Sequence, residues 1–315
     1  MSSLNKIISE NEHAVLRYYR ESDKEIKQRI LQAALKGSDK RYLEKLHSEV
    51  KKEIQKLEDK FKYFSIEGTA KAYKSGVDKT QAEFKQLKIP FEKLQLGNYA
   101  TFGGIHKEAV KVAAENTFKS YFKITQLIGR DTFEYFQRTN FKDTQKILQA
   151  LGQFVSSETM RDIGVTGIRG VVVGSESWQQ AVLRIEKEFA KQDIFKVPYY
   201  TKKDGSLHRM VSARDYVIVV AINTTAESHR TGTANRILET FGDNDLCTIV
   251  GPLDEKTAEA CADAVGQFYS IEGRTQGYPT IAEYEAAGGF HINCRHDLAI
   301  DFSVIEEYEK QGIEY

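Results

Sequence analysis

The sequence contains few cysteines and no long apolar run. Its three cysteines, Cys247, Cys261 and Cys294, are odd in number and all lie in the last quarter of the chain, which argues against the disulfide framework of a secreted protein. The longest apolar run, Tyr216 to Ile222, is far shorter than the roughly 20 residues that span a bilayer. Residues 1–20 also lack the continuous apolar block of a signal peptide. These absences predict a soluble protein that is made in the cytosol.

The chain has no formal net charge, since 45 Lys and Arg residues balance 45 Asp and Glu residues. The charges are nevertheless unevenly spread, because residues 1–125 carry about eight more basic than acidic residues and the remainder carries about eight fewer. A basic N-terminal region can face phosphate. The alternative is the solvated face of long helices, which the alternation of Lys and Glu favours.

Two long helices are predicted in the N-terminal part. Apolar residues fall near one stripe between residues 10 and 36, and Gly37 ends this pattern. A second helix begins after Ser38 and Asp39, either of which can cap its first turn. Its apolar residues recur at steps of three and four and form a heptad-like seam: Leu43, Leu46, Val50, Ile54, Leu57, Phe61 and Phe64. A seam this narrow needs a partner helix, which is either the first helix folded back or a helix of another protein.

The helical pattern weakens between Ser75 and Gly104, and we place a boundary there. An aromatic-rich helix is predicted over residues 105–136, with its aromatics in helix contacts rather than around a cofactor. Further helices are predicted over residues 143–155 and 175–191. We interpret the glycine-rich stretch between them as turns, because it lacks the Gly-Lys-Ser/Thr of a phosphate-binding loop.

The last third of the chain mixes strands and helices. Strands over residues 195–200 and 206–210, joined by a turn at residues 203–205, predict a β-hairpin, and Ser212 then caps a helix. The apolar run that follows suits either a strand or a helix, and a long buried helix to Phe241 is favoured because helical spacing continues beyond the run. The shorter elements expected after it are strands over residues 246–250 and 267–271 and a helix over residues 257–264.

Three blocks in this last third resemble phage minor head proteins, also called head morphogenesis or minor capsid proteins. They are Tyr200–Gly205 with the helix from Ala213, the block Asp254–Tyr269, and the block His291–His296. The last of these is similar to the family's His-Pro-Asn-Cys-Arg-His/Cys signature. Two positions depart from the family pattern, because Ala258 stands where the first cysteine of a Cys-x-x-Cys pair is usual and Ile292 stands where proline is usual.

The resemblance implies a structural virion protein rather than an enzyme. It implies a few copies per head, bound to the portal protein inside the capsid, with a role in head assembly and genome delivery. The expected location is the capsid interior at the portal vertex, after synthesis in the host cytoplasm. The packaged DNA and the major capsid protein are further expected partners.

Candidate contact residues follow from the seam and from the basic N-terminal region. The residues predicted to contact a protein partner are Leu43, Leu46, Val50, Ile54, Leu57 and Phe61. The residues predicted to lie near DNA, through phosphate contacts without base reading, are Lys51, Lys52, Lys56 and Lys60.

Cysteine and histidine also gather near the C-terminus. A structural zinc ion takes about four nitrogen or sulfur ligands in a tetrahedral array. The candidate ligands are Cys261, His291, Cys294 and His296, with Cys247 as a substitute for one of them. The alternative involves no metal and no cofactor, with the cysteines as small buried apolar groups and the histidines bonded to backbone.

A metal-dependent nuclease or another hydrolase that uses the same cluster is the alternative from a different class. His208, His229 and Glu227 are candidates for acid–base work, but no nucleophile elbow, HExxH or paired-carboxylate motif accompanies them. No catalytic residue is therefore predicted.

These observations predict a mostly α-helical α+β protein with a small sheet in its C-terminal core. We expect an N-terminal α-helical arm over residues 1–95, a helical region over residues 96–192, and an α+β core over residues 193–315. The acidic end, from Glu306 to Tyr315, is predicted to be solvated.

Overall fold

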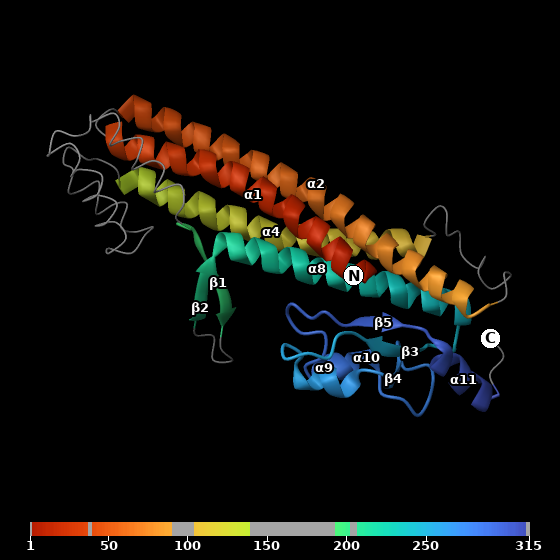
Figure 1. Cartoon of the computed structure of the whole chain (residues 1–315). Helices are drawn as coiled ribbons and strands as arrows, with labels where there is room; N and C mark the ends of the chain where they lie inside the picture. The colour runs from red at the N-terminus through yellow and green to blue at the C-terminus, as the bar shows by residue number, and fades with distance from the viewer. Residues whose placement is uncertain (1, 37–39, 90–103, 139–192, 202–206, 313–315) are drawn as a thin grey trace, which may run out of the picture. The chain divides into compact units, whose positions relative to one another are not determined.

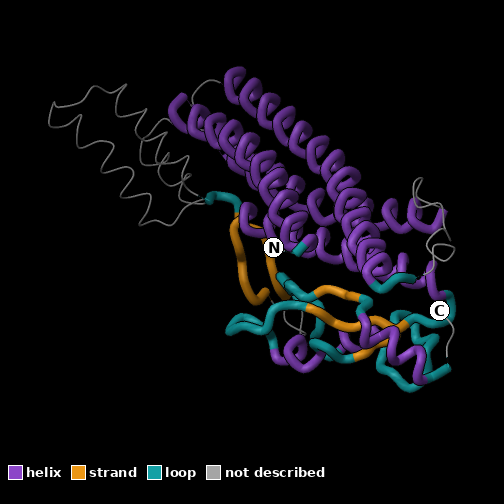
Figure 2. The backbone as a smooth tube through the Cα atoms, turned by 45° about the vertical axis from the view of Figure 1, so that its right-hand side comes forward, coloured by secondary structure: helices purple, strands orange, loops and turns teal. Residues whose placement is uncertain are grey.

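The computed structural model describes residues 2–36, 40–89, 104–138, 193–201 and 207–312. Four long helices make up most of this part of the chain (Figure 1): α1 (Ser3–Lys36), α2 (Lys40–Gln86), α4 (Gly104–Arg138) and α8 (Ala213–Phe241). The strands are short (orange in Figure 2) and lie in the C-terminal part of the chain: β1 (Lys196–Thr201), β2 (Leu207–Ser212), β3 (Leu246–Val250), β4 (Phe268–Ser270) and β5 (Asp297–Ala299). Three shorter helices complete the described elements: α9 (Glu259–Ala264), α10 (Ile281–Ala286) and α11 (Phe302–Lys310). The predicted fold class, mostly helical α+β, is confirmed.

The chain divides into two compact units, and each long helix contributes residues to both. The sheet unit comprises Met1–Ala14, Tyr63–Phe118 and Val219–Tyr315, and the hairpin unit comprises Val15–Lys62 and Lys119–Ile218. The two domain boundaries predicted near residues 95 and 192 lie outside the described residues.

In the hairpin unit, α1, α2 and α4 pack together through apolar stripes. The ring of Phe61 in α2 stacks on Tyr121 in α4 with centroids 4.5 Å apart. Polar contacts flank this packing, because Arg29 Nε donates to Glu49 Oε2 at 3.1 Å and Lys60 Nζ lies 2.8 Å from Glu21 Oε2. The seam of the second helix therefore packs against helices of the same chain.

The hairpin unit also contains β1 and β2, which pair antiparallel as predicted. Ser212 ends β2 and caps α8, since its Oγ accepts a hydrogen bond from Asp215 N at 3.0 Å. The β-rich run from Tyr216 to Ile222 is helical, because α8 continues without a break from Ala213 to Phe241. Gly242 then ends α8 with a positive φ of 63°.

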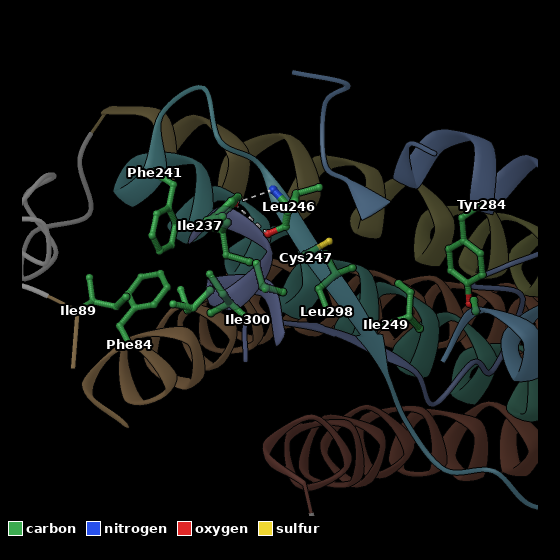
Figure 3. Packing of buried hydrophobic residues seen from close by; sticks show 14 of the residues in the cluster. Phe84, Ile89, Ile237, Phe241, Leu246, Cys247, Ile249, Tyr284, Leu298 and Ile300 are labelled. Carbon is green, nitrogen blue, oxygen red and sulfur yellow. Dashed lines mark hydrogen bonds between the residues drawn. The ribbon is translucent and has the colours of Figure 1, made fainter. Parts of the chain in front are cut away.

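The sheet unit is built around β3, which is the central strand of a three-stranded antiparallel sheet with order β4-β3-β5. The sheet packs against the ends of two long helices through a cluster that includes Phe84 of α2 and Phe241 of α8, whose ring centroids are 5.5 Å apart (Figure 3). Tyr308 of α11 closes this cluster, because its hydroxyl accepts from Leu246 N at 2.9 Å and donates to Asn244 O at 2.9 Å.

Several helix limits differ from those predicted. Helix α1 begins at Ser3 rather than near residue 10, because Leu4 and Ile7 extend its buried stripe. Helix α2 does not weaken at Ser75 but continues to Gln86, and Tyr73 and Phe84 are fully buried along it. Gly76 lies within α2 where this helix passes close to the backbone of α8.

The C-terminal end differs most from the prediction. Residues 302–310 form α11, in which Val304, Ile305 and Tyr308 are buried, so the segment from Glu306 is not simply a solvated end. The strand β5 and the helix α10 were not predicted. The helices expected over residues 143–155 and 175–191, the glycine-rich stretch and the turn at residues 203–205 lie outside the described residues.

None of the helices in the described part of the chain is both long enough and apolar enough to cross a membrane.

Candidate metal centre

Two loops and the short helix α9 bring cysteine and histidine together in the sheet unit. The first loop follows β3, where Gly251 leaves room for the His296 ring; a Cβ built on Gly251 would lie 2.4 Å from His296 Cδ2. The second loop joins α10 to β5 and closes a turn in which Cys294 N donates to His291 O at 2.9 Å. Asn293 has a positive φ of 62° in this turn, a conformation in which asparagine is enriched.

The cluster consists of Cys261 in α9 and of Cys294 and His296 in the second loop. The Sγ atoms of Cys261 and Cys294 are 3.7 Å apart, and Cys294 Sγ is 3.5 Å from His296 Nδ1. All three donor atoms lie within 4.8 Å of one another, and all three side chains are buried. Tyr284 of α10 is beside them, with its hydroxyl donating to Cys261 Sγ at 3.2 Å.

Burial sets the protonation of these groups. It raises the pKa of the Cys294 thiol to about 11. It lowers the pKa of His296, and a hydrogen bond to the Pro252 backbone offsets part of this lowering. The phenol pKa of Tyr284 is also raised by burial and by its bond to Cys261. At neutral pH the cluster therefore contains a neutral imidazole and a protonated Cys294 thiol.

Charged residues fix the two loops around the cluster. Arg295 donates to both carboxylate oxygens of Asp254, at 2.8 and 2.5 Å, and these bonds hold the pKa of Asp254 well below its usual range. The Arg230 guanidinium lies over the Phe290 ring, 4.1 Å from its centroid, and donates to His296 O at 3.2 Å.

Two of the five predicted metal ligands lie apart from this group. Cys247 is a fully buried residue of β3 (Figure 3). Its thiol faces the carbonyl of Tyr269 at 3.5 Å. His291 is only half-buried, and its Nδ1 is 2.9 Å from Ile292 O. The structure thus brings Cys261, Cys294 and His296 together and leaves Cys247 and His291 with other contacts.

A buried charged cluster next to the metal candidates was missed by the sequence analysis. Asp297 Oδ2 is 2.9 Å from Lys79 Nζ and 3.1 Å from His229 Nε2, and Glu83 also pairs with Lys79 at 3.4 Å. Burial alone would raise the pKa of Asp297, but Lys79 and His229 overcome that effect and hold the pKa well below its usual range. The spacing of Lys79 and Glu83 resembled an ordinary solvated helix face, so it gave no signal of burial.

Two of the three residues considered for acid–base work, His229 and Glu227, do not converge in the described structure. His229 is fully buried and bonded to Asp297, whereas Glu227 is exposed and lies two positions away on α8. The side chain of His208 lies outside the described part of the chain.

The predicted partner-contact residues are mostly buried within the chain. Leu46, Val50, Leu57 and Phe61 are buried. Leu43 and Ile54 are half-buried.

The predicted DNA-proximal lysines lie on the outer side of α2. Lys51, Lys52 and Lys56 are exposed, whereas Lys60 is half-buried. Lys56 Nζ is also 3.0 Å from Glu53 Oε2.

In the described residues, long helices are combined with a small antiparallel sheet, and a Cys/His turn precedes the strand β5. The chain matches the family model of phage minor capsid protein 2 over residues 99–312, which is more than half of its length. It therefore belongs to the phage minor capsid protein family, and its role is structural and virion-associated. Comparison with curated proteins and with solved structures finds no match.

Proposed function

We propose that this minor capsid protein binds the portal protein inside the phage head and contributes to head assembly and genome delivery. Membership of the minor capsid protein family carries this proposal, and a surface groove in the hairpin unit supports it. The groove has a volume of about 440 Å³. Its lining residues come from α2 and α4: His47, Val50, Lys51, Ile54, Gln55, Glu58, Thr125, Gln126, Gly129, Arg130, Thr132 and Phe133.

The groove combines an apolar floor with polar rims, as expected for a surface that receives a helix of another protein. Ile54 and Phe133 supply apolar surface, and Phe133 is 44% exposed. Gly129 adds no side chain there, so the floor stays open between the two helices. Arg130 lines the polar edge and can pair with an acidic residue of a portal helix.

Co-purification of the full-length chain with the portal protein of its own phage tests the proposal. We expect the wild-type chain to bind and Phe133→Glu to weaken binding at least tenfold, because a carboxylate would be placed on the apolar floor. Val112→Glu is a matched control, since Val112 is also an exposed apolar residue of α4, at 49%, but does not line the groove. Failure of the wild-type chain to bind the portal would overturn the proposed function.

If the portal protein bound Phe133→Glu and Val112→Glu as tightly as wild type, the proposed portal binding would stand. The groove would then be rejected as the binding site. Removing residues 1–95 is a poorer test, because it deletes Phe84 and Ile89 from the hydrophobic core of the sheet unit.

We also propose that α2 lies near the packaged genome and contacts DNA phosphates without reading bases. Lys51 and Lys52 are adjacent exposed residues on α2, and the first 125 residues carry the basic excess of the chain. Such contacts release counterions, so binding to duplex DNA should weaken steeply as salt increases.

Titration of duplex DNA at two salt concentrations measures this contact. The double variant Lys51→Glu/Lys52→Glu is expected to bind more weakly and to show a shallower salt dependence than wild type. Lys107→Glu/Lys111→Glu on α4 is the matched control for the change in net charge. Wild-type binding that did not change with salt would reject the DNA contact.

A further inference from the structure

The cluster of Cys261, Cys294 and His296 has the donor types and spacing of a metal site. Thiolate sulfur and imidazole nitrogen are the ligands that zinc takes in proteins, and soft sulfur ligands disfavour magnesium and calcium. The three donors come from two separate segments, α9 and the loop before β5, so a bound ion would join them.

The distances agree with a tetrahedral arrangement. Zinc bonds of about 2.3 Å to sulfur and about 2.0 Å to nitrogen, at tetrahedral angles, place two sulfurs about 3.8 Å apart and a sulfur and a nitrogen about 3.5 Å apart. The observed separations are 3.7 Å between the two Sγ atoms and 3.5 Å between Cys294 Sγ and His296 Nδ1. The third pair lies within 4.8 Å, so an adjustment of roughly 1 Å completes the triangle.

We propose that Cys261, Cys294 and His296 form a zinc site with three protein ligands and a fourth position that is taken by water. Zinc replaces the protons of the two thiols and joins α9 to the loop that leads into β5. The ion therefore fixes the loop that carries Asn293 and Arg295 and leads into Asp297 of β5.

Neighbouring groups support the charged form of the ligands. The Tyr284 hydroxyl donates to Cys261 Sγ, which stabilises a thiolate at that position. The positive charge of Arg230 favours the thiolate form of Cys294, and the same guanidinium holds the backbone of His296 through its carbonyl. Gly289 lets the ring of Tyr284 approach, since a Cβ built there would lie 2.2 Å from Tyr284 Cε2.

The site differs from an arrangement in which all five candidate residues share one ion. Cys247 faces the Tyr269 carbonyl, and the Nδ1 atom of His291 faces its neighbouring backbone carbonyl. Both residues are therefore controls rather than ligands. A disulfide between Cys261 and Cys294 would require a sulfur separation of about 2.05 Å, much shorter than the 3.7 Å observed.

Metal analysis of the full-length chain, produced in medium supplemented with zinc chloride and purified without a histidine tag, tests the proposal. We expect one zinc per chain in wild type, in Cys247→Ser and in His291→Ala, and loss of zinc in Cys261→Ser, Cys294→Ser and His296→Ala. The proposal would be overturned if the wild-type chain contained no zinc and took up none when zinc was added. Loss of zinc in Cys247→Ser or in His291→Ala would also overturn it, and so would a disulfide between Cys261 and Cys294.

Substitution of cobalt for zinc in the wild-type chain gives a reading that does not depend on whether the ligand variants fold. Two thiolates on a tetrahedral cobalt ion produce intense ligand-field absorption together with a sulfur-to-cobalt charge-transfer band. The weak absorption of octahedral cobalt, without charge transfer, would contradict the proposed ligands. Neither the metal analysis nor the cobalt spectrum involves the portal protein, so both results are independent of the proposed portal binding.

Discussion

Gly76 in α2 lies directly against the backbone of His229 in α8, so that a Cβ built on Gly76 would stand 1.9 Å from the His229 carbonyl oxygen. The contact is reciprocal, because a Cβ built on Gly232 would stand 2.1 Å from the carbonyl oxygen of Tyr73. Glycine at both positions lets the two helices cross with their backbones nearly touching. This crossing places Lys79 within reach of Asp297 and Tyr73 within reach of Asn235.

We therefore expect Gly76→Ala and Gly232→Ala each to destabilise the protein by about 2 kcal/mol or more, because backbone atoms must move to admit a methyl group. Chemical denaturation followed by circular dichroism measures the change. Gly129→Ala in α4 is the control, since its Cβ would lie 3.6 Å from Ile54 Cδ1, an ordinary contact, and alanine favours helix. A stability equal to wild type in both Gly76→Ala and Gly232→Ala would show that the helices can separate without cost.

The two glycines also show what sequence patterns predict and what they leave out. Helix α8 was predicted with its correct ends, because Ser212 and Gly242 supply local start and stop signals. In α2 the sequence pattern weakens after Ser75, and we placed a boundary between Ser75 and Gly104, whereas the helix continues to Gln86. Only the tertiary contact with His229 explains a glycine in the middle of a helix.

Asp297 is expected to be the most sensitive buried charge in the sheet unit. It accepts from both Lys79 and His229, and its side chain is 9% exposed. Asp297→Asn should destabilise the protein by about 3 kcal/mol, because the positive charge of Lys79 would be left buried with weaker compensation. Denaturation in urea provides the measurement, and Asp263→Asn, at an exposed position of α9, should stay within about 0.5 kcal/mol of wild type. A small effect at Asp297 would mean that Glu83 alone compensates Lys79.

Asp245 gives a prediction for the pH dependence of stability. Burial would raise its pKa, but hydrogen bonds from Ser270 Oγ, Glu272 N and Thr275 lower the pKa below its ordinary value. A carboxylate with a depressed folded-state pKa stabilises the fold fully above its unfolded pKa of about 3.9, and this contribution is lost as pH falls below that value.

Asp245→Asn should therefore cost about 2 kcal/mol at pH 7, and the difference from wild type should shrink as pH falls toward 3. Urea denaturation at both pH values measures this trend. Asp243→Asn, two residues away and exposed, should show no comparable loss at either pH. A difference that was constant with pH would mean that the carboxylate charge is not what holds the 270–275 loop.

The Cys/His cluster could be predicted from the sequence only in part. The short spacing of Cys294 and His296 and the resemblance to minor head proteins identified the relevant segments. Which of these residues lie close together depends on the direction in which each side chain points from its strand or helix. Cys247 points from β3 toward Tyr269, whereas Cys261 is carried by α9 toward Tyr284. Neither the φ of 62° at Asn293 nor the space left by Gly251 is visible in a residue pattern.

The last helix, α11, was missed because its charged residues hide a narrow apolar face. Tyr308 carries its most specific contact, since one hydroxyl satisfies both Leu246 N and Asn244 O at 2.9 Å beside the central strand. Tyr308→Phe should cost about 1–2 kcal/mol, because the Leu246 N–H group would remain buried without a partner while the ring still fills its space.

Tyr278→Phe is the matched control for this substitution. The Tyr278 hydroxyl donates to Glu307 at 2.5 Å, but the side chain is only half-buried, so water can replace the lost bond. We expect its cost to stay below about 0.5 kcal/mol in the same denaturation experiment. Equal costs for the two variants would mean that the hydrogen bond between Leu246 of β3 and the Tyr308 hydroxyl does not stabilise the fold. Packing alone would then hold α11 on the sheet.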